Sequence, residues 1–251
     1  MEAYGKFELL TCLARGGMAE VFLARQRGEG RFERLVVVKR ILPEYADDPR
    51  FVELFLEEAR IVALLDHPNV VPIYDLGRIG ESLFIAMPYV HGMSVQAMMK
   101  EATAARQPIP VGIGCGVALQ ALAGLEYAHD RTGLDGAPLE LIHQDISPSN
   151  LMINERGRVM LLDFGIASAA DSTTQRQGSM RGKLAYMSPE QVRGDPLDRR
   201  SDLFSLGIVL HELLAGRRLF KRRDAMSAMQ AVLERPIPSP RQGRPSIAEE
   251  I

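Results

Sequence analysis

The spacing of apolar residues changes near residue 90, and this change constrains the fold more than any other feature of the chain. Before it, short apolar runs separated by turn residues predict β-strands, among them 35–41, 70–76 and 83–87. Only 50–65 differs there, because its apolar residues recur every three or four positions, as on one face of a helix. After residue 90 the chain is mainly helical in composition and spacing. We therefore expect an α+β protein with two lobes that meet near residue 90.

The composition is that of an ordinary globular protein, with 46% hydrophobic and 25% charged residues among 251. A net charge of −2 gives no case for a nucleic-acid or membrane-surface partner, so the basic stretch 217–223 is interpreted as a solvated face or an acidic-substrate contact. Two cysteines, Cys12 and Cys115, form neither a disulfide framework nor a metal cluster, which fits a cytoplasmic location. No apolar run approaches the ~18–20 residues that cross a bilayer, so we expect no membrane segment. Nothing in the sequence indicates the oligomeric state.

Two charged residues lie inside apolar patterns of the first lobe. Lys39 ends a run of four apolar residues, and Glu58 lies on the apolar stripe of the helix predicted over 50–65. Burying either charge alone is costly, so the simplest arrangement is an ion pair between the two. The alternative, two solvated groups at the ends of their elements, is reasonable for Lys39 but poor for Glu58.

Three polar residues lie in loops between apolar segments of the second lobe. Asp145 and Asn150 are five positions apart, and Asp163 follows an apolar strand. Each alone would be an ordinary turn residue. Together they offer oxygen ligands for a hard cation with few protein ligands, and one possible base.

In these motifs and in their order the chain resembles the eukaryotic-like (Hanks-type) Ser/Thr protein kinases of bacteria. The matching segments, in chain order, are Leu13–Val21, Val36–Lys39, Glu58, Met87–Val90, His143–Asn150, Asp163–Gly165 and Ser188–Glu190. The resemblance implies a two-lobed kinase fold, with a small antiparallel sheet and one helix over 1–90 for nucleotide binding. Residues 91–251 would form the larger, mainly helical lobe with the catalytic loop and the activation segment. It also implies that this lobe continues past Ile251 with further helices.

The resemblance further implies ATP and Mg²⁺ as cofactors. Lys39, held by Glu58, would contact the α- and β-phosphates, Asn150 and Asp163 would bind Mg²⁺, and Asp145 would accept the proton of the substrate hydroxyl. The residues implied in nucleotide binding are Leu13, Ala14, Arg15, Gly16, Gly17, Met18, Ala19, Glu20, Val21, Val37, Lys39, Met87, Pro88, Val90 and Met152.

Several positions depart from the family pattern. Ala14 and Ala19 replace two glycines of the nucleotide loop, and Ala restricts positive-φ conformations. Gln144 replaces the arginine that commonly answers a phosphate on the activation loop, which makes activation by such a phosphate less expected. Ser147 and Lys183 stand where the family has Lys and Thr. Our hypothesis is that the two functions have exchanged places, so that Lys183 is a catalytic cation, and an unchanged rate in Lys183→Ala would reject it. The alternative is that both functions are lost.

The resulting expectation is a signalling protein kinase that transfers the γ-phosphoryl group of Mg-ATP to Ser or Thr hydroxyls of protein substrates. The alternative is a kinase-like ATP-binding scaffold with weak or no transfer, which the altered nucleotide loop and the Ser147/Lys183 change would favour. A small-molecule phosphotransferase is disfavoured, because Ser188–Glu190 resembles the segment that shapes a peptide site.

Overall fold

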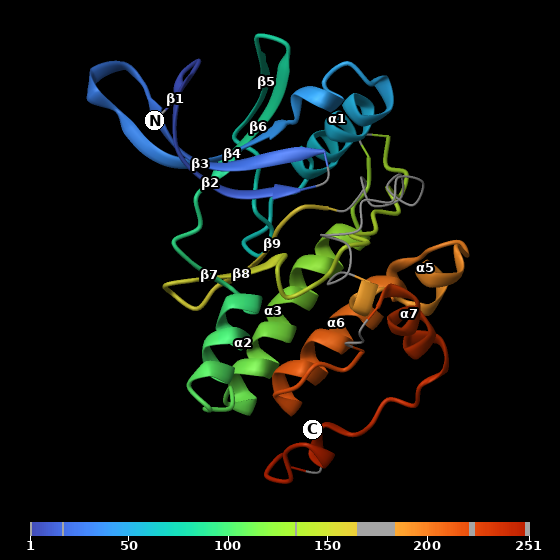
Figure 1. Cartoon of the computed structure of the whole chain (residues 1–251). Helices are drawn as coiled ribbons and strands as arrows, with labels where there is room; N and C mark the ends of the chain where they lie inside the picture. Colours follow the sequence, from blue (N-terminus) through green and yellow to red (C-terminus); the bar gives the residue numbers. More distant parts are fainter. Residues whose placement is uncertain (1, 17, 134, 165–183, 221–223, 249–251) are drawn as a thin grey trace. The chain divides into compact units, whose positions relative to one another are not determined.

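The computed structural model describes residues 2–16, 18–133, 135–164, 184–220 and 224–248. The chain divides into two units. The first comprises the described residues up to His67 together with Val71–His91, and the second comprises Pro68–Val70, Gly92–Phe164 and the described residues from Leu184 on. Each unit contains its own antiparallel sheet (Figure 1).

The first unit is built on a six-stranded sheet in the order β1-β2-β3-β4-β6-β5. All neighbouring strands pair antiparallel. The strands are β1 (Glu2–Tyr4), β2 (Phe7–Gly16), β3 (Ala19–Arg27), β4 (Glu33–Ile41), β5 (Asp75–Ile79) and β6 (Ser82–Pro88), with short 3₁₀ turns at Glu29–Arg31 and Pro43–Tyr45. Helix α1 (Pro49–Ala63) begins after Asp48, whose side chain accepts the Arg50 N–H. The described part of the unit thus has the expected antiparallel sheet and one α-helix.

The two faces of this sheet bury different clusters. On one face, buried side chains from several strands pack against one another. They include Phe7, Val36, Val38 and Phe84. The other face packs against α1, where Ile41 and Ile85 meet Phe55 and Ala59. Because side chains alternate along a strand, Val37, Lys39 and Ile41 of β4 all belong to the α1 side. This alternation places Lys39 on the same side as helix α1.

The second unit is mainly helical, as expected. A three-stranded sheet is formed by β7 (Gly92–Ser94), β8 (Leu151–Asn154) and β9 (Val159–Leu161). The helical elements are α2 (Val95–Ala104), α3 (Val111–His129), η5 (Leu184–Tyr186), α5 (Pro189–Arg193), α6 (Arg199–Ala215), α7 (Ala225–Glu234) and η6 (Pro240–Gln242). Strand β7 passes so close to β8 that a Cβ atom at Gly92 would overlap the carbonyl oxygen of Ile153, which explains the glycine at that position.

Helices α3 and α6 form the centre of the second unit. Helix α6 is buried on nearly all sides, as its all-round apolar composition predicts. Gly114 of α3 lies against Leu213 and Leu214 of α6. Among the described helices, the 19-residue α3 has the length and mean hydropathy that a membrane-crossing helix needs, although Gln120 and Glu126 interrupt its apolar sequence. Seven α3 residues are nevertheless buried within the unit, which is typical of the core helix of a folded domain.

Candidate active site

The predicted ion pair in the first unit is confirmed. Nζ of Lys39 on β4 lies 2.5 Å from Oε1 of Glu58 on α1, and the two side chains are only 12% and 6% exposed. Both charges are thus withdrawn from water and compensate each other, which the apolar surroundings require. The pair holds the Lys39 ammonium on the α1 side of the sheet.

The predicted nucleotide loop is the β2–β3 hairpin. Gly16 at the end of β2 pairs with Ala19 at the start of β3, and Gly17 lies outside the described residues. Met18 is buried with the α1 cluster, and its carbonyl accepts the Leu42 N–H at 2.8 Å. Neither Ala14 nor Ala19 has a positive φ. The two alanines therefore cause no backbone strain in the described hairpin.

Glu20 faces away from Lys39. Its carboxylate pairs with Arg40 at 3.0 Å and with Arg15 at 3.3 Å, and Arg40 also reaches Glu2. Burial alone would lower the pKa of Arg40, but the hydrogen bonds that its guanidinium donates to the Glu2 and Glu20 carboxylates raise the pKa above its usual value. The Glu20 side chain is engaged with arginines on the face of the sheet opposite to Lys39. A nucleotide beside Lys39 could therefore contact only the backbone of Glu20.

The other residues implied in nucleotide binding occupy several strands. On the α1 side of the sheet, Val21 pairs with Lys39 across the strands and Met87 with Val37. Pro88 closes β6 opposite Val36, and Val90 follows as a buried residue. Leu13 and Arg15 are exposed on β2, and Met152 is half-buried on β8 of the second unit.

In the second unit, the predicted base and one predicted metal ligand, Asp145 and Asn150, are hydrogen-bonded to each other. Nδ2 of Asn150 donates to the carbonyl of Asp145 at 2.9 Å and to its Oδ2 at 2.8 Å. The Asn150 carbonyl accepts the N–H of Leu162, the residue before Asp163. Because the Asn150 amide nitrogen faces Asp145, its Oδ1 is the atom that would face a cation. An amide oxygen and a carboxylate, such as that of Asp163, are the kinds of ligand that fit Mg²⁺, which takes few protein ligands.

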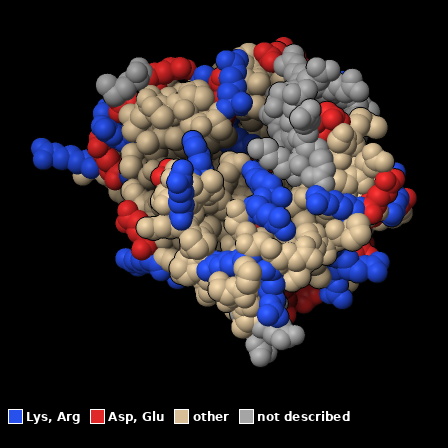
Figure 2. All heavy atoms as spheres, turned by 60° about the horizontal axis from the view of Figure 1, so that its bottom comes forward, with Lys and Arg blue, Asp and Glu red and all other residues tan. Residues whose placement is uncertain are grey.

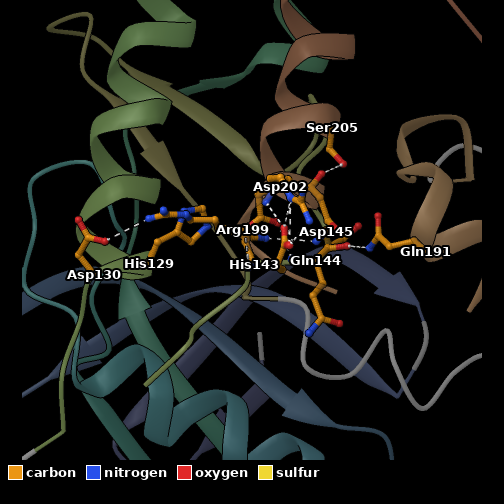
Figure 3. Close-up of polar contacts among 12 residues, drawn as sticks. His129, Asp130, His143, Gln144, Asp145, Gln191, Arg199, Asp202 and Ser205 are labelled. Atoms are coloured by element: carbon orange, nitrogen blue, oxygen red, sulfur yellow. Dashed lines mark hydrogen bonds and ion pairs between the residues drawn. The ribbon is translucent and has the colours of Figure 1, made fainter. Parts of the chain in front are cut away.

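Asp202, at the start of α6, supports the residues before Asp145. Its Oδ2 accepts the His143 N–H and its Oδ1 accepts the Gln144 N–H, both at 2.8 Å (Figure 3). His129 Nε2 lies 2.8 Å from the same Oδ2. Asp202 itself is 1% exposed. A buried carboxylate thus anchors two successive backbone N–H groups at the start of the segment 143–150, which is the predicted catalytic loop.

His143 is a packed core residue. It is fully buried, its ring centre lies 4.6 Å from that of Phe164, and its Nε2 donates to the Leu162 carbonyl at 2.9 Å. Among the residues that the structure describes, no three His, Cys, Asp or Glu side chains could jointly hold a metal ion.

Of the proposed exchange pair, only Ser147 can be located. It is 2% exposed, and its Oγ lies 2.9 Å from Oγ of Ser149. Lys183 lies outside the described residues. The hydroxyl of Ser147 is thus bonded within the catalytic loop, and the role of Lys183 stays a hypothesis.

Two polar residues of the second unit escaped the sequence analysis. Gln191 on α5 donates to the Gln144 carbonyl, and the Ser-x-x-Gln spacing of 188–191, typical of a capping box, would have singled it out. Glu212 lies inside the apolar α6, the same signal that identified Glu58. It accepts hydrogen bonds from the Tyr186 hydroxyl at 2.7 Å and the Leu219 N–H at 2.9 Å.

The basic stretch after α6 is partly engaged inside the molecule. Nη1 of Arg218 lies 3.4 Å from Oε2 of Glu212, and its guanidinium lies over the Tyr186 ring. Residues 221–223 lie outside the described part. On the face seen in Figure 2, blue side chains are interrupted by tan ones, and red ones lie mainly toward the rim.

Glu212 makes the stability of the protein depend on pH. Burial raises the pKa of its carboxyl to about 7, although the hydrogen bond from Leu219 opposes the shift. The folded state therefore binds a proton more tightly than the unfolded chain, and the free energy of unfolding falls as the pH rises from about 4.5 to about 7. We expect the free energy of unfolding of the wild type, relative to that of Glu212→Gln, to fall by on the order of 2–3 kcal/mol between pH 5 and pH 8. Urea unfolding of both proteins across this range measures it, and a pH-independent difference would contradict the expectation.

The sequence is similar to those of known protein kinases. The protein kinase domain family model matches residues 7–246. Tyrosine-protein kinase MasK of Myxococcus xanthus is 42% identical over 252 residues, which cover 100% of this chain and 39% of MasK. Serine/threonine-protein kinase PrkC of Bacillus subtilis is 36% identical over 248 residues, 98% of this chain and 36% of PrkC. Serine/threonine-protein kinase PknB of Mycobacterium leprae is 38% identical over 240 residues, 93% of this chain and 36% of PknB.

A crystal structure of the kinase domain of Mycobacterium tuberculosis PknI matches with a TM-score of 0.67 and 26% identity, over 97% of this chain and 83% of that chain. The chain belongs to the protein kinase family and has the protein kinase fold, a curled antiparallel sheet followed by a helical region. It spans 36–39% of the length of the curated relatives named above.

Proposed function

We propose that the chain is an ATP-dependent protein kinase domain that transfers the γ-phosphoryl group of Mg-ATP to Ser or Thr hydroxyls of protein substrates. The observation that carries this proposal is the hydrogen-bonded group around Asp145. Its carboxylate is held by Asn150, and Asn150 is bonded to the segment that ends in Asp163. The candidate base and one candidate metal ligand are bonded to each other, and the second candidate ligand directly follows the residue bonded to Asn150, which supports a role in phosphoryl transfer.

Each polar group has a defined role in this proposal. Asp145 orients the substrate hydroxyl and accepts its proton, while Asn150 fixes the direction of the Asp145 carboxylate. Lys39, kept in place by Glu58, binds the α- and β-phosphates. Asn150 Oδ1 and the Asp163 carboxylate hold Mg²⁺, which when bound neutralises charge on the phosphates. Most of the rate would come from positioning and charge stabilisation.

An active enzyme is favoured over a pseudokinase scaffold. All five polar groups of the proposed centre are present, and the described hairpin residues Ala14 and Ala19 adopt no strained backbone. The names of the relatives divide on the acceptor, since MasK is a tyrosine-protein kinase and PrkC and PknB are serine/threonine-protein kinases. We propose Ser and Thr as the acceptors, in line with the two relatives so named.

The proposal includes the organisation of the chain. Residues 1–90 would form the nucleotide-binding lobe, and 91–251 the lobe with the catalytic loop and the activation segment. The exchange of Ser147 and Lys183, a cytoplasmic location and a signalling role belong to the proposal in the same way.

The decisive test is phosphosite mapping after incubation with Mg-ATP and a generic protein substrate. We expect phosphate on Ser and Thr, and none when EDTA removes the metal, because the proposed ligands can bind the nucleotide productively only together with a divalent ion. Phosphate confined to Tyr would change the acceptor class. No incorporation in the presence of Mg²⁺ would favour the scaffold.

A further inference from the structure

The side-chain amide of Gln191 links helix α5 to the catalytic loop. Its Nε2 donates to the carbonyl of Gln144 at 2.8 Å, a contact visible in Figure 3. Its Oε1 accepts the Ser188 N–H at 2.9 Å, and the backbone N–H of Gln191 donates to Ser188 Oγ. Both polar atoms of the amide are therefore used, one in the helix cap and one across to the loop.

The loop residue that Gln191 contacts has an unusual backbone. Gln144 has φ +63°, a left-handed conformation that is unfavourable for a residue with a side chain. Its N–H is held by Asp202 and its carbonyl by Gln191, so the residue is fixed on both sides. Two hydrogen bonds from separate helices thus maintain a conformation that the residue alone would disfavour.

Gln191 acts on the peptide unit that joins Gln144 to Asp145. The Gln144 carbonyl that accepts the hydrogen bond from Gln191 belongs to this peptide unit. The orientation of the peptide unit sets the position and direction of the Asp145 backbone. At the other end of Asp145, Asn150 holds both the carbonyl and the carboxylate. Asp145 is consequently fixed from two sides: on the side that precedes it, its own N–H donates to the His143 carbonyl at 2.9 Å and Gln191 holds the Gln144 carbonyl.

We propose that Gln191 is a positioning residue for phosphoryl transfer, which keeps the Asp145 carboxylate in its reactive direction through the Gln144 carbonyl. This inference rests on the proposed kinase activity. The tether is a neutral hydrogen bond and needs no charge at position 144, where the chain has Gln in place of the family's Arg. The loop geometry is thereby set without a phosphate on the activation segment.

The diagnostic variant is Gln191→Glu. A carboxylate still accepts the Ser188 N–H, so the capping box is preserved, but it cannot donate to the Gln144 carbonyl. Losing one such hydrogen bond at a positioning contact should lower kcat about five- to tenfold, with the KM for ATP unchanged. Hydrogen exchange of the amides over 141–148 should become faster.

Gln120→Glu is the matched control in the same unit. Gln120 also bridges a backbone carbonyl and a backbone N–H, donating to Gly157 at 3.1 Å and accepting from Val159 at 3.0 Å. If Gln191 only stabilised the fold, Gln191→Glu and Gln120→Glu would show the same melting temperature, the same kcat and the same rates of amide exchange. Our proposal predicts that only Gln191→Glu loses kcat and protection over 141–148.

Equal kcat in the wild type and Gln191→Glu, or equal losses in the two variants, would overturn the role of Gln191. If the wild type transfers no phosphate, the proposed function fails, and the exchange comparison alone decides whether the tether holds the loop. Unchanged exchange over 141–148 in Gln191→Glu would then reject it.

Discussion

Replacing Asp145 with Asn should lower the rate of phosphoryl transfer by about 10²–10⁴-fold, the usual contribution of a positioned base. An Asn side chain has the same size and can still accept the hydrogen bond from Asn150, so the loop should keep its conformation. What it cannot do is take the proton of the substrate hydroxyl. The rate is measured with radiolabelled ATP and a protein substrate, and nucleotide affinity is measured separately by calorimetry.

A matched control is Asp130→Asn, which makes the same change at an exposed position of the second unit. Asp130 pairs loosely with Arg199 at 3.6 Å, and both side chains are more than 60% exposed. We expect this variant to transfer phosphate at the wild-type rate. A similar rate in Asp145→Asn and the wild type would remove Asp145 from the mechanism, whereas loss of ATP affinity together with rate would point to a structural defect.

The parts of the site that could be predicted from the sequence are those in which a charge interrupts an apolar pattern. The cost of burying a charge alone predicts that Lys39 pairs with Glu58, and the structure shows the two side chains in contact. Glu212 carries the same signal within α6 and could have been found in the same way. The cost of burying a charge is large, so it is visible in a single sequence without knowledge of the fold.

Features that depend on backbone geometry could not be predicted. The left-handed conformation of Gln144 leaves no mark in its residue type, since Gln has no preference for positive φ. The strand expected over 70–76 begins only at Asp75, because Asn69 and Val70 instead pair with Leu161 of the second unit. Such contacts between distant segments override the local preference for a strand.

Of the substitutions discussed, removal of the Asp202 carboxylate should cause the largest fall in the free energy of unfolding. In Asp202→Ala the His143 and Gln144 N–H groups lose their acceptor in a buried environment, and His129 loses a partner. Each unsatisfied buried donor costs about 1–3 kcal/mol, so the free energy of unfolding should fall by about 3–5 kcal/mol. That is a large part of the stability of a typical domain, about 5–15 kcal/mol. Urea unfolding followed by circular dichroism measures the loss.

Asp198→Ala, four residues earlier and at the start of the same helix, separates this effect from helix capping. Asp198 caps α6 by accepting the Arg200 N–H, and the hydrogen bonds from Arg200 hold the pKa of its exposed carboxyl down at about 2. If Asp202 acted only as a first-turn acid of α6, the two variants would lose similar stability. We expect a clearly greater loss for Asp202→Ala, because its carboxylate holds the N–H side of Gln144 while Gln191 holds the carbonyl side.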